Sequence, residues 1–201
     1  MKTFRFLSRL LILPVLFFPV SCNVLKPLED ISVSHLLDPV IPERRITGSK
    51  PGIAIPRPSL PTYLDRNELV TRTHTGELRM SSWHVWAEPL DSSISRVTAA
   101  NLGRLVNSLN IQPVENFITV DYEWLLEIRV SRFETDANGD FVFACTWKLQ
   151  PVTGKTAPVR DFTIRIPMTP GNPAAAGPQT ERVNAMNEAL AVLARKIAGA
   201  L

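Results

Sequence analysis

The chain has 201 residues, of which 45% are hydrophobic and 20% are charged, and its formal net charge is +3. Lys2, Arg5 and Arg9 account for that excess, so the rest of the chain is neutral overall. A neutral remainder gives no electrostatic indication of nucleic-acid binding. The length beyond the N-terminal segment suits a single domain with one hydrophobic core.

Residues 1–21 have the layout of a bacterial secretory signal. The three basic residues come first, and an apolar run of 11 residues follows from Leu10 to Val20. A transmembrane helix needs about 20 apolar residues, so this run is too short to span a bilayer. We therefore interpret residues 1–21 as a signal peptide.

Cys22 closes this signal, directly after Ser21. A cysteine at the cleavage point resembles the lipobox of a lipoprotein signal peptide, which implies that its thiol receives a diacylglycerol. Asn23 follows where an inner-membrane lipoprotein typically carries Asp, so the resemblance implies an outer-membrane anchor facing the periplasm. Pro19 stands where a lipobox usually has leucine, which leaves an ordinary cleaved signal as the alternative.

Residues 22–30 are expected to form a lipidated tether, and residues 31–201 a single folded domain. Ser32–Asp38 has the weak pattern of a first strand. Six prolines between Pro39 and Pro61 keep that stretch extended, because proline fixes φ and lacks a backbone donor. Within it, Gly52–Ile55 is apolar enough to be a strand of the sheet.

The middle of the chain predicts a hairpin and then a helix. Leu69–Thr75 and Glu77–Ser82 flank Gly76, a turn residue. The helix has cap candidates at Asp91–Ser93 and is expected to end at Asn110. Its apolar face is defined by Ile94, Val97, Leu102, Leu105, Val106 and Leu109.

The second half carries the strongest strand patterns. Tyr122–Val130 and Phe141–Leu149 both alternate between apolar and polar residues, which indicates one buried and one solvated face. Residues 136–140 (DANGD) have turn chemistry, so the two strands should form a hairpin. Residues 162–166 continue the alternation as a third strand of an antiparallel meander.

The last elements are a loop and a long helix. Met168–Pro178 is rich in proline, glycine and alanine and is expected to be a loop. The helix after it is indicated by apolar residues three or four apart, namely Val183, Met186, Leu190, Leu193, Ile197 and Leu201. Its alanines would allow it to lie close to a sheet. The predicted fold class is α+β, two-layer, with a mainly antiparallel sheet and two long helices packed on one face.

The sequence contains no recognisable catalytic or metal-binding motif. His74 and His84 could approach each other across the hairpin at Gly76, but no neighbouring ligands complete a metal site. Glu123 and Glu127 lie on the solvated side of a strand. Cys145 lies on an apolar side and is interpreted as a small buried hydrophobe, with a reactive thiol or an intermolecular bridge as the alternative. We predict a protein without enzymatic activity, metal or cofactor.

Residues 54–89 gather large aromatic and charged side chains in a proline-rich setting. Such side chains are enriched where proteins bind other proteins. The alternative is that Trp83 and Trp86 fill the junction between sheet and helix, and the sequence favours neither interpretation.

The same stretch carries a family resemblance. IPRPSLPTYLDRNELVTR (Ile55–Arg72) and ELRMSSWHVWAEPLDSSISRV (Glu77–Val97) resemble the motifs of the ABC-type transport auxiliary lipoproteins, the PqiC-like family. The W-x-L of Trp147–Leu149 and the alanine-rich C-terminal helix fit the same pattern. The resemblance covers most of the chain after Cys22.

The resemblance implies a role in intermembrane lipid transport. Members of this family are partners of MCE-domain proteins, which bridge the periplasm, and the resemblance carries over Cys22 as the acylated residue. It also implies a partner-facing surface. At the motif edge, a partner segment could bind by strand addition, because sheet edges carry unpaired N–H and C=O groups. The residues predicted to form this surface are Ile55, Pro56, Arg57, Leu60, Tyr63, Leu64, Arg66, Trp83, Trp86 and Glu88.

Two questions stay open at the level of sequence. The alternative function is a periplasmic lipid carrier, which a large apolar cavity would favour, whereas a filled core with an exposed apolar patch would favour docking. The expected partners are an MCE-domain protein and outer-membrane lipids, and the chain acts either as a monomer or as a homo-oligomer.

Overall fold

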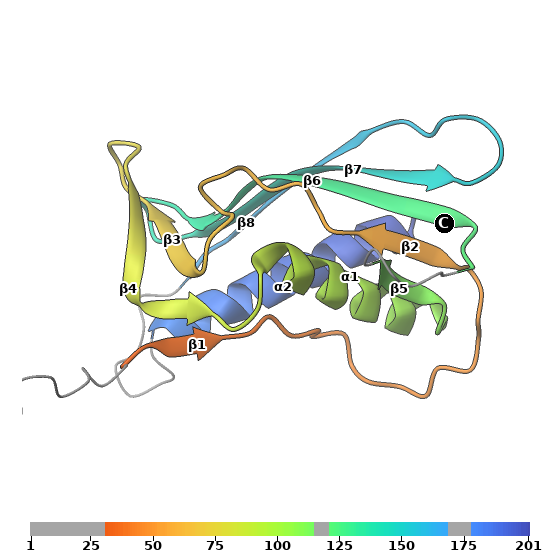
Figure 1. Cartoon of the computed structure of the whole chain (residues 1–201), viewed down its shortest axis with the longest axis horizontal. Coiled ribbons are helices and arrows are strands. Elements are labelled where there is room, and N and C mark those ends of the chain that lie inside the picture. Colours follow the sequence, from red (N-terminus) through yellow and green to blue (C-terminus); the bar gives the residue numbers. More distant parts are fainter. Residues whose placement is uncertain (1–30, 115–120, 169–177) are drawn as a thin grey trace, which may run out of the picture. The chain divides into compact units, whose positions relative to one another are not determined.

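The computed structural model describes residues 31–114, 121–168 and 178–201. In this part of the chain, eight strands form one curled sheet and two helices lie against it (Figure 1). The predicted α+β class is confirmed. The elements in chain order are β1 (Val33–His35), β2 (Ile53–Pro56), β3 (Glu68–Arg72), β4 (Leu78–Trp86), α1 (Leu90–Val106), β5 (Ile111–Val114), β6 (Trp124–Thr135), β7 (Phe141–Pro151), β8 (Arg160–Ile166) and α2 (Pro178–Ala198).

The predicted meander forms the most extensively paired part of the sheet. Strands β6, β7 and β8 are antiparallel neighbours, with Thr135 opposite Phe141 at the tight end of the first hairpin. In the turn, Asp136 Oδ1 accepts the N–H groups of Asn138 and Asp140 at 2.9 and 3.1 Å. Gly139 supplies the left-handed backbone there, with φ of 89°.

The other edge of β6 is shared by several short segments. β2 pairs with its beginning and β3 with its end, both in parallel, and the residues between them bond to its middle. β5 extends the sheet beyond β2, while β4 and then β1 extend it beyond β3. The β3–β4 hairpin at Gly76 is confirmed. The sequence did not predict β5, a four-residue strand interrupted by a proline.

Helix α1 differs at both ends from the prediction. The N-cap is Pro89, without a side-chain cap hydrogen bond, so Asp91–Ser93 do not cap the helix. It ends at Val106 because Asn107 takes the left-handed conformation, with φ of 58°, which asparagine tolerates better than most residues. Leu109, predicted on the apolar face, lies beyond the helix and is 59% exposed.

Helix α2 follows the predicted pattern closely. Val183, Met186, Leu190, Leu193 and Ile197 are all buried, whereas Leu201 lies beyond the helix end and is exposed. Ala189 and Ala194 are fully buried, which brings the helix close to its neighbours. Most of the loop predicted over Met168–Pro178 lies outside the described residues, as do the signal and the tether.

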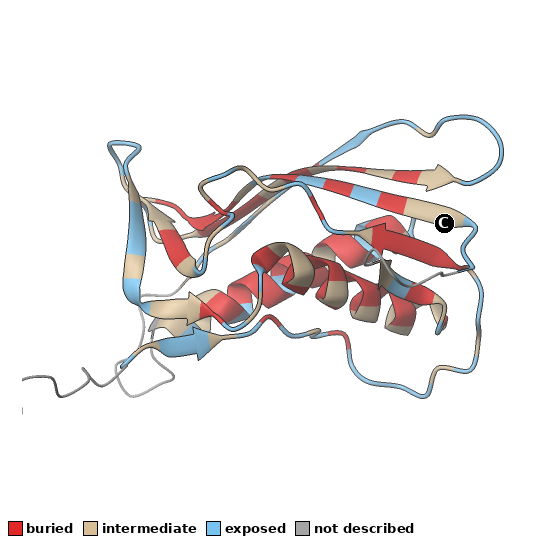
Figure 2. Cartoon of the chain, viewed as in Figure 1, coloured by how far each residue is buried: buried red, intermediate tan, exposed pale blue. Residues whose placement is uncertain are grey.

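The core between the sheet and the helices is filled with aromatic side chains. Phe133, Phe141, Phe143 and Phe162 meet edge to face, with ring centroids 5.0–5.5 Å apart. Figure 2 shows the buried residues lining α1 and α2 and alternating with exposed ones along β6. Cys145 belongs to this core, and its burial raises the pKa of the thiol to about 12. It therefore fits the prediction of a small buried hydrophobe.

None of the helices in the described ranges is long and apolar enough to cross a membrane.

Candidate functional site

The two motif segments meet in the β3–β4 hairpin. The first leaves β2, runs along β6 and leads into β3. Ser59 N–H donates to Ile128 O at 3.1 Å, and Val130 N–H donates to Ser59 O at 2.9 Å. Because β2 itself pairs with both β5 and β6, this part of the motif has no free strand edge to which a partner segment could add. The second segment ends β4 and leads into α1.

Part of the predicted partner surface is buried. Ile55 is inaccessible to solvent, Leu64 is 2% exposed and Trp86 is 7% exposed. Direct contact with a partner is not available to these three side chains, because they are packed into the core. Trp86 therefore fills the junction between sheet and helix, as in the alternative interpretation. Trp83 does not, because it is 56% exposed. Pro56, Leu60, Tyr63 and Arg66 are half-buried.

Glu88 and Arg57 fix the start of α1. Glu88 Oε1 accepts hydrogen bonds from Arg96 Nη2 at 2.7 Å and from Ser93 Oγ at 2.6 Å. Burial opposes ionisation of Glu88, but these hydrogen bonds outweigh it and lower its pKa. Arg57 Nη1 lies 3.7 Å from Asp91 Oδ2 in the first turn of the helix. Both motif residues thus attach the helix to the chain that precedes it.

Tyr63 belongs to a buried network around Glu134, which the sequence did not predict. Glu134 is inaccessible to solvent, and its Oε1 accepts from Arg72 Nε and Arg132 Nε, each at 2.9 Å. Tyr63 OH donates to Glu134 Oε2 at 2.9 Å, and the Phe133 N–H does the same at 2.9 Å. Burial, followed by the charge of Glu134, raises the pKa of Tyr63 to about 12. This network ties the first motif segment to the far end of β6.

A β-bulge changes which residues of β6 face the core just before Glu134. The pairing of β6 with β7 shifts between Val130 and Arg132, which leaves Ser131 as an extra residue. The core-facing positions of β6 therefore change from even to odd, ending with Phe133 and Thr135. Glu134 points to the opposite face, where its hydrogen-bond partners Tyr63, Arg72 and Arg132 bury it. The sequence carried a signal of this shift, since Phe133 follows Val130 by three residues instead of two.

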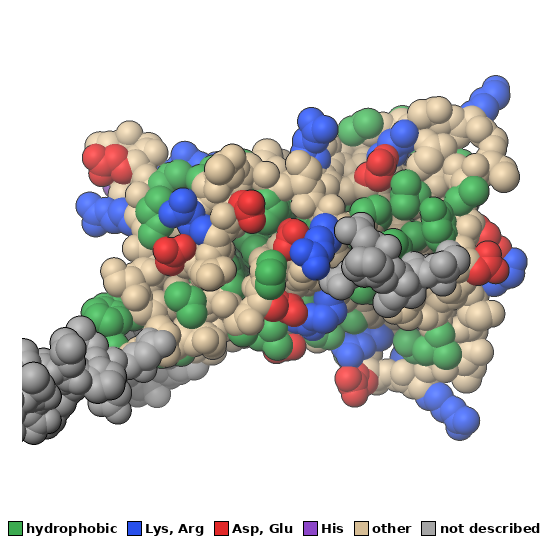
Figure 3. All heavy atoms as spheres, in the orientation of Figure 1, with side chains coloured by type: hydrophobic (Ala, Val, Ile, Leu, Met, Phe, Trp, Pro, Cys, Tyr) green, Lys and Arg blue, Asp and Glu red, His purple; other side chains and the backbone are tan. Residues whose placement is uncertain are grey.

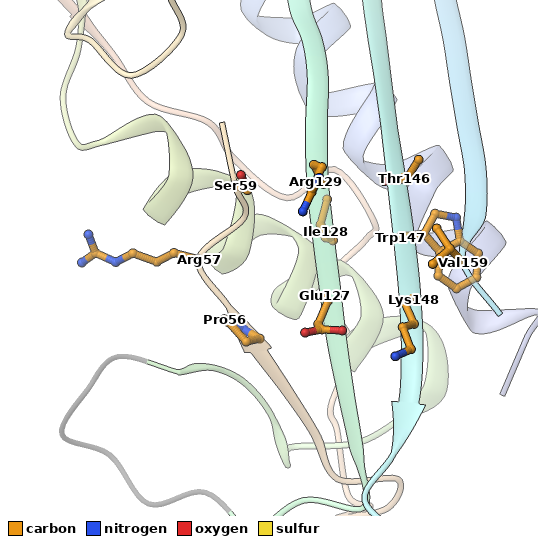
Figure 4. Close-up of a pocket in the computed structure, with 10 residues that line it drawn as sticks. All are labelled: Pro56, Arg57, Ser59, Glu127, Ile128, Arg129, Thr146, Trp147, Lys148 and Val159. Carbon is orange, nitrogen blue, oxygen red and sulfur yellow. The ribbon is translucent and has the colours of Figure 1, made fainter. Parts of the chain in front are cut away.

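A groove of about 490 Å³ lies on the outer face of the sheet, away from the helices (Figure 4). The motif residues Pro56, Arg57 and Ser59 form one side of it, and Val159, 66% exposed, contributes from the other. The remaining lining residues come from β6 and β7: Glu127, Ile128, Arg129, Thr146, Trp147 and Lys148.

The groove combines charged and apolar groups. Glu127 stands opposite Lys148 and Arg129 opposite Thr146, so the cation of Arg129 has no acidic cross-strand partner on β7. Figure 4 shows the Arg57 side chain pointing away from β6. The Trp147 ring is buried, and Arg160 Cζ lies over it, 5.2 Å from the ring centroid. We call the ten lining residues the outer groove.

The histidines do not meet as predicted. His74 lies in the turn between β3 and β4, whereas His84 lies at the other end of β4. His84 Nδ1 is instead 2.9 Å from His35 Nε2 on β1. Burial, then the neighbouring His84 and Arg182, lower the pKa of His35. Within the described ranges, no group of three or more His, Cys, Asp or Glu side chains is arranged to hold a metal ion.

This histidine pair predicts a stability that falls in acid. Because the pKa of His35 is lower in the folded chain than its ordinary value of 6.5, the unfolded chain binds its proton first as the pH falls. The free energy of unfolding should therefore decrease below about pH 6.5. Urea unfolding on both sides of that pH measures the effect. His35→Gln should flatten this dependence and His74→Gln should leave it unchanged, and equal slopes in all three proteins would contradict the assignment.

Comparison with known proteins places this geometry in a family. The model of the ABC-type transport auxiliary lipoprotein component family matches residues 35–198, which confirms the family predicted from the two motifs. No significant match is found among curated proteins.

Two solved structures share the fold, and a third is less similar. A crystal structure of an uncharacterised protein is similar over 77% of this chain and 94% of its own, with 20% identity and a TM-score of 0.61. A DUF330 protein from Xanthomonas campestris is similar over 84% and 90%, with 17% identity and a TM-score of 0.60. A PelC dodecamer from Paraburkholderia phytofirmans is similar over 74% and 91%, with 13% identity and a TM-score of 0.40.

Proposed function

The chain belongs to the family of ABC-type transport auxiliary lipoprotein components, and from this premise we propose that it docks an MCE-domain protein at the outer membrane. In this proposal the chain is a non-catalytic subunit of an intermembrane lipid transport system. Residues 1–21 are removed as a signal peptide, and acyl chains on Cys22 hold the domain on the periplasmic side of the membrane. Residues 22–30 serve as its tether.

The observation that carries the docking role is the outer groove. A family motif segment supplies its Pro56, Arg57 and Ser59, and hydrogen bonds between Ser59 and β6 hold that segment in place. The helices cover the other face of the sheet, so this face is left for a partner. A rigid, motif-built surface requires little ordering on binding, which favours affinity.

The chemistry of the outer groove indicates what binds there. Arg129 lies on β6 between the motif segment and β7, Lys148 adds a second cation opposite Glu127, and Pro56 and Val159 contribute apolar groups to the same lining. A partner segment with a carboxylate beside an apolar side chain complements this pattern. The charge would orient the segment, and the apolar contact would contribute most of the binding free energy.

The alternative function, a lipid carrier, has less support. A carrier needs space between sheet and helices for acyl chains, and that space holds the packed phenylalanines of the core. Accommodating a lipid there would require displacing side chains such as Phe133 and Phe143, which are at most 2% exposed. The filled core therefore favours docking.

Changing the outer groove should reduce partner recovery. The double variant Arg129→Glu with Val159→Asp reverses one charge and places another in the apolar wall. We expect the MCE-domain protein recovered with the lipoprotein from detergent-solubilised envelopes to fall about tenfold, which corresponds to about 1.4 kcal/mol. Lys196→Glu, an exposed charge reversal on α2, is the matched control and should recover the partner normally.

Two further results decide the proposal. Cys22→Ala should still recover the partner after solubilisation, because acylation only localises the domain. Recovery of bound lipid without any MCE-domain protein would favour the carrier instead. Equal recovery with the outer groove variant and with Lys196→Glu would exclude the outer groove as the docking surface.

A further inference from the structure

Exposed apolar side chains gather where the folded unit begins. Ile31 and Val33 are 57% and 49% exposed, and Trp83 on the neighbouring strand is 56% exposed. The parallel pairing of β1 with β4 sets Val33 beside His84, so Val33 and Trp83 lie on adjacent strands at this edge of the sheet, on its opposite faces. Figure 3 shows hydrophobic side chains gathered at the corner where β4 approaches β1. We call Ile31, Val33, Leu36 and Trp83 the tether-end patch.

The chain under this patch is firmly held. Leu37 and Ile41 point inward and are buried, while Leu36 and Val40 beside them stay about 40% exposed. The Asp38 N–H donates to Asn187 Oδ1 on α2 at 3.0 Å, and the Ile41 N–H donates to Asn101 Oδ1 on α1 at 3.1 Å. The exposure of the apolar residues is therefore a fixed feature of the fold.

The length of the chain before Ile31 indicates what covers the patch. Residues 22–30 are nine residues, which reach at most about 30 Å when fully extended. With Cys22 acylated, the patch is confined to within that distance of the bilayer. Trp83 is suited to the headgroup region, where an aromatic ring has one apolar and one hydrated side. Arg79 is exposed on the same strand as Trp83 and would face anionic headgroups.

We propose that the tether-end patch lies on the membrane surface and inserts Trp83 and Val33 into the headgroup layer. This inference rests on the proposed acylation of Cys22 and adds an orientation to it. The acyl chains fix the distance of the domain from the bilayer, and the patch fixes which end faces the lipid. The outer groove, on the outer face of β6 and β7, then stays available to a periplasmic partner.

Tryptophan fluorescence in vesicles tests this orientation. The acylated native protein is reconstituted into vesicles of phosphatidylethanolamine and phosphatidylglycerol, with and without brominated acyl chains. Bromine quenches only rings that enter the lipid. We expect quenching and a blue shift of the emission, and we expect Trp83→Phe to abolish both. Trp86 and Trp147 are buried, and the half-buried Trp124 lies at the beginning of β6, the end of the sheet away from β3 and β4. Equal iodide quenching of Trp83 with and without vesicles would overturn the proposal.

A second pair of variants separates a lipid contact from a partner contact. Val33→Ser with Leu36→Ser should reduce the bromine quenching of Trp83, whereas Leu109→Ser with Val152→Ser, both 59% exposed outside the patch, should not. Neither pair should reduce recovery of the MCE-domain protein. Loss of that partner with the first pair would identify the patch as a protein surface and overturn the membrane assignment.

The intact mass of the reconstituted protein shows whether Cys22 is acylated, and so distinguishes a failure of the proposed orientation from a failure of the proposed anchoring. An acylated protein whose Trp83 stays in water contradicts the orientation alone. A protein without acyl chains contradicts the anchoring in the proposed function, and with it the reason for placing lipid on the patch.

Discussion

Replacing Glu134 by alanine is expected to lower the free energy of unfolding by about 3 kcal/mol. Removing one member of a buried ion network leaves its partners without compensation, and the Tyr63 hydroxyl and the Phe133 N–H would both lose an acceptor. The side chains of Arg72 and Arg132 are 31% and 33% exposed, so water relieves part of the loss. This partial relief keeps the expected effect at the low end of what buried pairs show.

The measurement is urea unfolding of the folded unit, followed by circular dichroism. Glu127→Ala is the matched control, since it removes an exposed carboxylate from the same strand and should change stability by less than about 0.5 kcal/mol. Tyr63→Phe should cost about 1 kcal/mol, and much less in the Glu134→Ala background, because the hydroxyl then has lost its carboxylate acceptor. Equal midpoints for Glu134→Ala and Glu127→Ala would show that the network contributes nothing measurable.

This network also explains part of the family motif. Tyr63 bonds to Glu134, which lies 71 positions later in the chain. Ile55, Leu64 and Trp86 are buried in the core and also hold distant segments together. Much of the motif therefore stabilises the sheet, and the motif residues left for binding a protein partner are those beside the outer groove.

Local periodicity predicted most of the architecture. The alternation along β7 predicts burial of Phe141, Phe143 and Cys145, because each strand residue points opposite to its neighbour, and all three are buried. The three- and four-residue spacing of α2 does the same for Met186 and Leu190. Both signals depend only on which face of an element the core covers.

Pairings between distant segments were beyond this kind of inference. Nothing in the sequence near His84 indicates that its partner is His35, because a parallel pairing joins strands without a tight turn. The same holds for β5, whose four residues acquire their strand conformation by pairing with β2. The predicted approach of His74 to His84, by contrast, rested on the nearby hairpin turn and was wrong. His74 lies in that turn, whereas His84 lies at the opposite end of β4.

The candidate site was predicted at the level of segments and less well at the level of side chains. Polar and aromatic residues in 54–89 indicated a surface, and Arg57 and Pro56 do line the outer groove. Its other wall comes from Glu127, Arg129 and Lys148 on strands interpreted only as solvated faces. Their role depends on the motif segment crossing beside β6, which only the tertiary structure shows.

Replacing Cys22 by alanine is expected to move the protein from the membrane fraction to the soluble periplasmic fraction. Each buried CH₂ of an acyl chain contributes about 0.8 kcal/mol of membrane affinity, and one chain alone holds a protein only marginally. A diacylglycerol supplies two chains, so its loss removes the stable anchor. The tether-end patch alone offers a few half-exposed side chains, which support transient contact at most.

Cys145→Ala is the matched control for that experiment, because its thiol is 1% exposed and should not affect membrane attachment. Fractionation of envelopes, with the intact mass of the mature protein, reads out both variants. A Cys22→Ala protein that stays in the membrane fraction as fully as Cys145→Ala would contradict acylation at this position. In acylated protein, Asn23→Asp should shift the domain to the inner membrane, away from the proposed docking site at the outer membrane. Transport would then fail although the outer groove is intact, which separates the role of the anchor from that of the docking surface.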